Sequence, residues 1–261
     1  MESILFIVEG EKEEPLIIKT LISKFFKKRI NAITSYNTNI HQLYNSLSSD
    51  SDIDIISLLK EQGKLSDLSM KSDDIAEKYL FFDLDPHDGS FCFSNISELL
   101  DFFNDETENG KLYINYPFTE ALYEHQDINF LTKEIATKKC KSYKKNLKNN
   151  FVNHSVVKPA YDNLINRFSP ALARRKINQE QIPNKWKNLW YYKISLQEWK
   201  DVIKPHIDKA VHLTGCNNPD DDLHGPVFNI QMARSGTNGT IYILSIYGIF
   251  IYEYFKDWQS V

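Results

Sequence analysis

The stretch YLFFDLDPHD, residues 79–88, decides the fold expected for this chain. Its apolar residues lead into Asp83 and Asp85, and Pro86 then ends the strand. An unbroken apolar run is typical of a strand buried on both faces of a parallel sheet. Because strand side chains alternate, the two aspartates are predicted to point to the same side at the carboxyl end, where open α/β sheets bind ligands. An acidic turn without a ligand fits the same residues.

The segments around this strand alternate between strand and helix. A first strand is expected over residues 4–8, and Gly10 permits the tight turn that exposes Glu9 at the carboxyl edge of the sheet. Further strands are expected over residues 31–36 and 111–115 and helices over residues 11–25, 40–47, 94–103 and 117–125, whereas residues 53–60 fit either. Ser94 or Asn95 is expected to cap its helix. Such alternation predicts an α/β fold with a parallel-sheet core and flanking helices.

The pattern changes after about residue 128, where the strands give way to helices. We expect a lysine-rich helix over residues 131–150, helices broken by prolines over 155–190, and a helix over 195–204 capped by Ser195. Residues 240–255 are predicted to form a buried helix, or a strand followed by a helix. The sequence therefore divides into an α/β domain, residues 1–128, and a basic, mostly helical C-terminal region, residues 129–261, that is expected to pack on it.

The composition of the chain is that of an ordinary soluble globular protein, with 261 residues, 42% hydrophobic and 25% charged. No apolar run reaches the length of a membrane span, and the N-terminus lacks a secretory pattern, so we expect a cytoplasmic protein without a membrane partner. Cys92, Cys140 and Cys216 form no CxxC pair, which predicts neither a disulfide framework nor a zinc site.

The charge of the chain is unevenly distributed. The net charge is −4, but residues 131–176 contain twelve Lys or Arg and two acids, a local charge of +10. A basic block beside an acidic core is typical of a protein with a polyanionic partner, although a solvated lysine-rich helix explains it as well. The lysines expected to follow nucleic-acid phosphates are Lys138, Lys139, Lys141, Lys144 and Lys145.

Three carboxylates are predicted to meet at one edge of the sheet. Glu9 follows the first strand, whereas Asp83 and Asp85 end a later one, and the carboxyl ends of parallel strands lie together. Carboxylates without a basic partner repel one another, and a divalent cation relieves that repulsion. Hard oxygen ligands suit Mg²⁺ or Mn²⁺, which can activate water and stabilise charge on a phosphodiester.

Two short motifs resemble the signatures of the Toprim fold, and the resemblance covers about residues 1–125. They are FIVEGE at residues 6–11 and FDLD at residues 82–85. The longer pattern resembles most the compact OLD and RloB types, which are nucleases associated with phage defence. The resemblance implies that Glu9, Asp83 and Asp85 hold the catalytic metal and that the glutamate serves as general acid or base.

The chain also departs from the pattern of that family. Glycine commonly follows the DxD motif two or three residues on, but here Gly89 comes one residue later, after residues 86–88. Asp88 is a further candidate for the metal shell, with a plain loop residue as the alternative. Glu120, on the expected helix 117–125, is a candidate for an extra ligand or a supporting carboxylate.

We therefore expect a Mg²⁺- or Mn²⁺-dependent endonuclease that acts on DNA or RNA in antiviral defence. One alternative is a primase-like nucleotidyl transferase. The other is a regulated or inactive Toprim subunit that works with a separate ATPase, because this chain has no P-loop motif of the form GxxxxGK[ST]. Nucleic acid, a separate ATPase subunit and a second copy of the chain are the partners to be tested.

Overall fold

A computed structural model describes residues 3–25, 30–49, 53–65, 74–124, 129–150, 195–216, 218, 221–255 and 258. The helices expected over residues 155–190 lie outside these ranges. None of the helices within them has the length and apolar character needed to cross a membrane.

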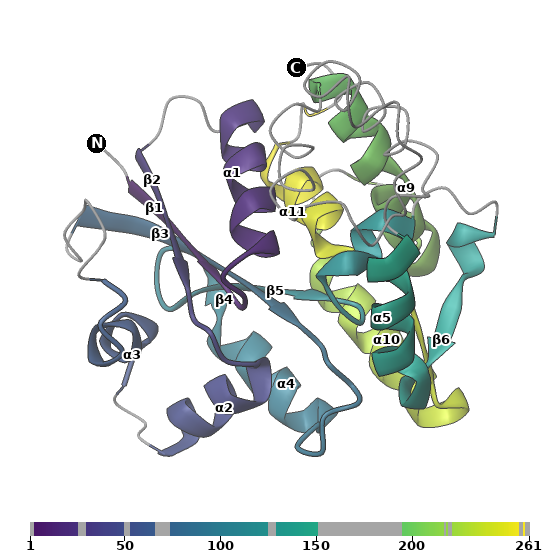
Figure 1. Ribbon diagram of the computed structural model, residues 1–261, viewed down its shortest axis with the longest axis horizontal. Helices are drawn as coiled ribbons and strands as arrows, with labels where there is room; N and C mark the ends of the chain where they lie inside the picture. The colour runs from purple at the N-terminus through teal and green to yellow at the C-terminus, as the bar shows by residue number, and fades with distance from the viewer. Residues whose placement is uncertain are drawn as a thin grey trace, which may run out of the picture.

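A five-stranded sheet forms the centre of the molecule, in the order β2-β1-β3-β5-β4 (Figure 1). The strands are β1 (Ser3–Val8), β2 (Ile30–Ser35), β3 (Ile75–Asp83), β4 (Asn104–Asp105) and β5 (Gly110–Asn115). The first four in the spatial order run parallel, whereas β4 lies antiparallel to β5 at the edge. The expected α/β class with a mostly parallel sheet is confirmed.

The register of the strands brings their carboxyl ends to one level. Val8, the last residue of β1, pairs with Phe81, and Asp83 at the end of β3 pairs with Asn115 at the end of β5. The next residue, Glu9, donates its backbone N–H to the carbonyl of Phe81 at 3.1 Å. Glu9 and Asp83 therefore leave the sheet at the same edge.

Helices cover both faces of this sheet. They are α1 (Glu13–Phe25), α2 (Ile40–Ser49), α3 (Ile55–Glu61) and α4 (Phe93–Phe102) in the first half of the chain. Helix α1 lies on one face, whereas α2, α3 and α4 lie on the other (Figure 1). The ambiguous segment 53–60 is helical, and Asp54 caps α3 by accepting a hydrogen bond from the N–H of Ser57 at 2.6 Å.

Two predictions about helices in the first half are wrong. The N-cap of α4 is Cys92, and the hydroxyl of Ser94 contacts the Cys92 sulfur at 2.9 Å instead of capping the helix. The helix expected over residues 117–125 is the shorter, tighter 3₁₀ helix η2 (Thr119–Glu124). An i to i+3 bond between the N–H of Ala121 and the carbonyl of Phe118, 2.9 Å long, closes its first turn.

The lysine-rich helix begins later than predicted. Helix α5 spans Cys140–Asn150, and η3 (Phe130–Thr132), β6 (Glu134–Ala136) and η4 (Thr137–Lys139) precede it. Strand β6 pairs antiparallel with β7 (Thr240–Tyr242). Residues 134–136 therefore form a strand because they pair with β7, about a hundred residues later in the sequence, although their local pattern is helical.

The C-terminal helices are α9 (Leu196–Thr214), α10 (His224–Asn238) and α11 (Ile246–Tyr254). Ser195 caps α9 as predicted, through a capping box with Glu198. The helix is longer than expected, since it continues past Pro205 and ends at Gly215 with φ of 72°. Residues 240–255 form a strand followed by a helix, which was one of the two predicted arrangements.

Aromatic packing attaches the C-terminal region to the sheet. The ring of Phe250 on α11 lies 6.2 Å from Phe6, 5.1 Å from Phe81 and 5.3 Å from Tyr113, each distance joining ring centroids. The three partners come from β1, β3 and β5, and all four side chains are buried. Helix α11 thus packs against the strands whose ends carry the predicted acidic residues.

Candidate active site

Glu9 meets the β3 acids at the carboxyl edge of the sheet. Its Oε2 atom accepts a hydrogen bond from the backbone N–H of Asp83 at 3.0 Å. Burial, followed by the charges of Asp83 and Asp85, raises the pKa of Glu9 to about 9. The structure therefore brings together the three acids that the sequence predicted to converge.

Asp83 is 1% exposed, and both of its carboxylate oxygens have partners. Oδ1 accepts hydrogen bonds from the N–H and the hydroxyl of Thr119, at 2.7 and 3.1 Å. Oδ2 lies 2.9 Å from Nζ of Lys144. The side-chain amide of Asn115 donates to the Thr119 hydroxyl at 3.1 Å, so β5 and η2 together fix the Asp83 carboxylate. Thr119 carried no signal in the sequence.

Asp85 offers an oxygen that no hydrogen bond occupies. Its backbone has φ of 43°, in the left-handed region that aspartate tolerates, and its N–H donates to the carbonyl of Pro117 at 3.2 Å. Oδ1 is buried without a hydrogen-bond partner, although Nδ1 of His87 lies 3.9 Å away. Burial and then the charge of Asp83 raise the pKa of Asp85. This oxygen is the clearest place for a ligand in the site.

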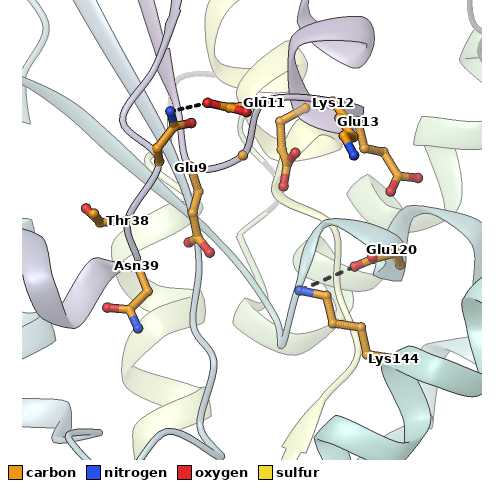
Figure 2. A pocket seen from close by; sticks show the side chains of 11 residues that line it. Glu9, Glu11, Lys12, Glu13, Thr38, Asn39, Glu120 and Lys144 are labelled. Carbon is orange, nitrogen blue, oxygen red and sulfur yellow. Dashed lines mark hydrogen bonds and ion pairs between the residues drawn. The ribbon is translucent and has the colours of Figure 1, made fainter. Parts of the chain in front are cut away.

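Lys144 lies inside the acidic site, unlike the other lysines predicted to contact phosphates. Its Nζ is 3.7 Å from Oε2 of Glu120, which is 2% exposed (Figure 2). Burial lowers the pKa of Lys144, but the charges of Asp83 and Glu120 outweigh burial and hold the pKa well above its usual range. Lys144 thus contacts Asp83 and Glu120, and its predicted contact with phosphate stays a prediction. The four lysines that remain exposed are Lys138, Lys139, Lys141 and Lys145.

A fifth carboxylate, Glu14, was missed because acids in the first turn of α1 were interpreted as a helix start. Burial and then the charge of Asp83 raise the pKa of Glu14 to about 7. Its Oε2 lies so close to Gly10 that a Cβ added there would stand 2.6 Å from it. Gly10 therefore lets the first turn of α1 bring Glu14 to the side of Glu9.

Asp88 and His41 lie near the acidic site. The Asp88 carboxylate accepts hydrogen bonds from the side-chain amide of Asn39 at 3.2 Å and from the N–H of Ser90 at 2.8 Å, which is the plain loop role. His41, in the first turn of α2, is 3% exposed, and neither ring nitrogen has a hydrogen-bond partner. Its charge would act on both Asp85 and Asp88. The sequence gave no reason to select His41.

A pocket of about 650 Å³ opens beside Glu9, Glu14 and Glu120, whereas Asp83 and Asp85 are not among the residues that line it. Glu120 and Lys144 lie on one side of it, and Thr38 and Asn39, just before α2, lie on the other, with Glu9 between them (Figure 2). This volume lies in the range of ordinary small-ligand sites. The pocket gives the acidic edge of the sheet an opening to a substrate.

The donor atoms suit a hard divalent cation. They are carboxylate oxygens, and one of them, on Asp85, is buried without a hydrogen bond. Burial and then repulsion among the acids raise the pKa values of Glu9 and Asp85, and a cation would relieve that repulsion. Among the residues that the structure describes, however, no three His, Cys, Asp or Glu side chains form a ready-made metal site. Lys144 holds the oxygen of Asp83 that faces the cluster. The residues therefore fit Mg²⁺ or Mn²⁺ by their chemistry, provided that the Lys144 contact opens.

Comparisons of this chain with protein-family models, with curated proteins and with solved structures found no match. The resemblance to the Toprim fold stays a prediction from its two motifs.

Proposed function

We propose that the chain is a metal-dependent nuclease of the Toprim type, which hydrolyses phosphodiester bonds of nucleic acid. One observation carries the proposal: Glu9, Asp83 and Asp85 gather at the ends of two neighbouring parallel strands, and Glu9 also lines an open pocket. Crowded carboxylates with raised pKa values are typical of sites that bind a cation or move a proton.

In this proposal Glu9, Asp83 and Asp85 hold Mg²⁺ or Mn²⁺, with Glu120 as a supporting carboxylate. The cation supplies the positive charge that binds a phosphodiester and stabilises charge developing on it. Thr119 keeps Asp83 in one orientation through its two hydrogen bonds. In the cation-free protein Glu9, with a pKa of about 9, carries a proton at neutral pH, and it would release that proton on binding the cation.

Exposed lysines near the site extend the proposal to the nucleic-acid partner. Lys138 and Lys139 lie on η4, and Lys141 and Lys145 lie on α5, the helix that also delivers Lys144 to the acids. Cations at this position would bind the backbone phosphates on either side of the cleaved bond without reading sequence.

A second candidate is a regulated or inactive subunit that works with a separate ATPase. The ion pair between Lys144 and Asp83 favours it, because an ammonium group already neutralises an acid that catalysis would need. In that case the pocket would bind a cation without turnover, or activity would appear only when the partner is added.

Cleavage assays separate the two candidates. The purified chain would be incubated with plasmid, single-stranded DNA and tRNA, each with Mg²⁺, Mn²⁺ or EDTA. We expect cutting that requires the cation and falls at least about 100-fold in Glu9→Gln and Asp83→Asn, since each change removes a few kcal/mol of charge stabilisation. Glu108→Gln, at an exposed acid outside the site, is the matched control. Cutting that persists in EDTA or in both site variants would contradict the proposal.

The resemblance also motivates a test in cells. Expression of the chain in a bacterial host should lower the plating efficiency of phages, and Glu9→Gln should abolish the effect if hydrolysis is the cause. Equal protection by the Glu9→Gln variant would favour the binding subunit.

A further inference from the structure

Lys144 contacts the acidic site, whereas the neighbouring lysines on α5 are exposed to solvent. Its side chain is 27% exposed, whereas Lys141 and Lys145 point into solvent. Nζ of Lys144 lies 2.9 Å from Oδ2 of Asp83 and 3.7 Å from Oε2 of Glu120. A single ammonium group thus bridges two carboxylates that arrive from β3 and η2.

This contact and a metal bound at Asp83 would place two positive charges on one carboxylate. Thr119 already holds Oδ1 of Asp83 with two hydrogen bonds, so Oδ2 is the oxygen that would turn to a cation. A small divalent cation binds an oxygen at about 2.0–2.2 Å, and a second positive charge in van der Waals contact with it would be strongly repelled. The two positive charges therefore compete for this oxygen.

We propose that Lys144 is the resident counter-ion of the acidic site, and that a divalent cation binds only by displacing its ammonium group from Asp83. Lys144 thereby sets the cation concentration at which the site fills. The inference depends on the proposed function, since it assumes that Glu9, Asp83 and Asp85 bind the cation.

The surroundings of Lys144 allow such a displacement without movement of α5. The side chain borders the pocket of about 650 Å³, which leaves space for the ammonium group to move into solvent. Nζ also lies 5.2 Å from the centre of the Phe118 ring, within the range of a cation–π contact that does not involve Asp83. The present pose of Lys144 therefore combines this ring contact with the ion pairs, and the pocket gives the ammonium group room to leave both.

Cation binding to the full chain tests this inference without measuring activity. Titration calorimetry with Mn²⁺ and Mg²⁺ would compare the unaltered chain, Lys144→Met and Lys145→Met. We expect Lys144→Met to bind at least tenfold more tightly, because no positive charge has to be displaced. Lys145→Met removes the same charge from the same helix at an exposed position and should change affinity less than twofold. Unchanged or weaker binding by Lys144→Met would overturn the inference.

Acetylation of the unaltered chain provides the second measurement, in case Lys144→Met folds poorly. Peptide mass spectrometry would follow Nζ acetylation of Lys144 with and without Mn²⁺, with Lys145 as the internal reference. Displacement predicts that Mn²⁺ speeds the modification of Lys144 relative to Lys145. Equal or slower modification at a saturating concentration of Mn²⁺ would rule displacement out.

The failure of this inference differs from the failure of the proposed function. If Glu9→Gln and Asp83→Asn lose cation binding while Lys144→Met binds like the unaltered chain, only the role of Lys144 is wrong. If no variant binds the cation, or if Glu9→Gln and Asp83→Asn bind it normally, the nuclease site itself is wrong and the role of Lys144 falls with it.

Discussion

Three carboxyl groups of the site hold protons more tightly than carboxyl groups in water do. The pKa is raised to about 9 for Glu9 and to about 7 for Glu14, and it is also raised for Asp85. Burial is the largest cause in each case, followed by the charge of Asp83. The folded, cation-free protein therefore binds protons that the unfolded chain releases.

This proton binding predicts how stability depends on pH. The pKa of Glu9 rises from 4.5 to about 9 on folding, so its contribution is fully present below pH 4.5 and is lost as pH rises to about 9. We expect the free energy of unfolding in EDTA to fall across this window, by at most about 1.4 kcal/mol per pH unit for one group. Urea denaturation at pH 5, 7 and 9 measures it. Glu9→Gln should flatten the profile, whereas a profile that rises towards pH 9 would contradict this account.

The buried ring of His41 is expected to lower the stability of the protein. A buried polar group without a hydrogen bond costs about 1–3 kcal/mol, and both ring nitrogens of His41 are in that condition. Its ring packs edge-on against Phe91, with 5.8 Å between centroids. We expect His41→Phe to unfold at a temperature a few degrees higher, and to cleave nucleic acid more slowly if the imidazole serves the site. A lower melting temperature would show that the imidazole stabilises the fold.

Helices α9 and α11 cross closely at Gly248. A Cβ at this position would stand 2.9 Å from the carbonyl oxygen of Ile203 and 3.1 Å from Cβ of His206. Gly248→Ala should therefore destabilise the protein by about 1–3 kcal/mol in urea denaturation. Gly236→Ala on α10 is the matched control, because nothing lies near its Cβ, and it should be neutral or stabilising by up to about 1 kcal/mol. Equal stability of the two variants would refute the close crossing.

Helices and strands that depend on neighbouring residues alone were predicted from the sequence. The apolar runs of β1 and β3, and the helices that follow β1 and β2, could be read from residue spacing. Residues 134–136 could not, because their strand depends on β7, far away in sequence. The N-cap at Cys92 was missed since its side chain makes no capping hydrogen bond.

The site was predictable to the same extent. Glu9, Asp83 and Asp85 follow from the rule that parallel strands end at one edge. Lys144 and Glu14 reach the site through the packing of α5 and through the turn at Gly10, which no spacing in the sequence records. The sequence therefore did not predict the contact of Lys144 with Asp83 or the presence of Glu14, and both change the net charge of the site.

The whole molecule combines an acidic edge with exposed lysines on η4 and α5. The logarithm of the binding constant falls as the logarithm of the salt concentration rises. If that surface binds nucleic acid, each lysine in contact with a phosphate makes this slope steeper by about 0.7–0.9. We therefore expect Lys141→Gln to reduce the steepness of this dependence by the same amount in fluorescence anisotropy with labelled DNA or RNA. Lys60→Gln, on α3, should leave it unchanged. A slope that Lys141→Gln does not alter would place the nucleic acid elsewhere.

The central claim is that the acids at the carboxyl edge of β1 and β3 form one site for a divalent cation. Anomalous diffraction from crystals soaked in Mn²⁺ tests it most directly. We predict a Mn²⁺ peak within bonding distance of Asp83 and of Asp85 or Glu9, with the ammonium group of Lys144 moved off Asp83. The absence of a peak among these three acids, with Lys144 still bound to Asp83 at Mn²⁺ concentrations that support cleavage, would contradict it.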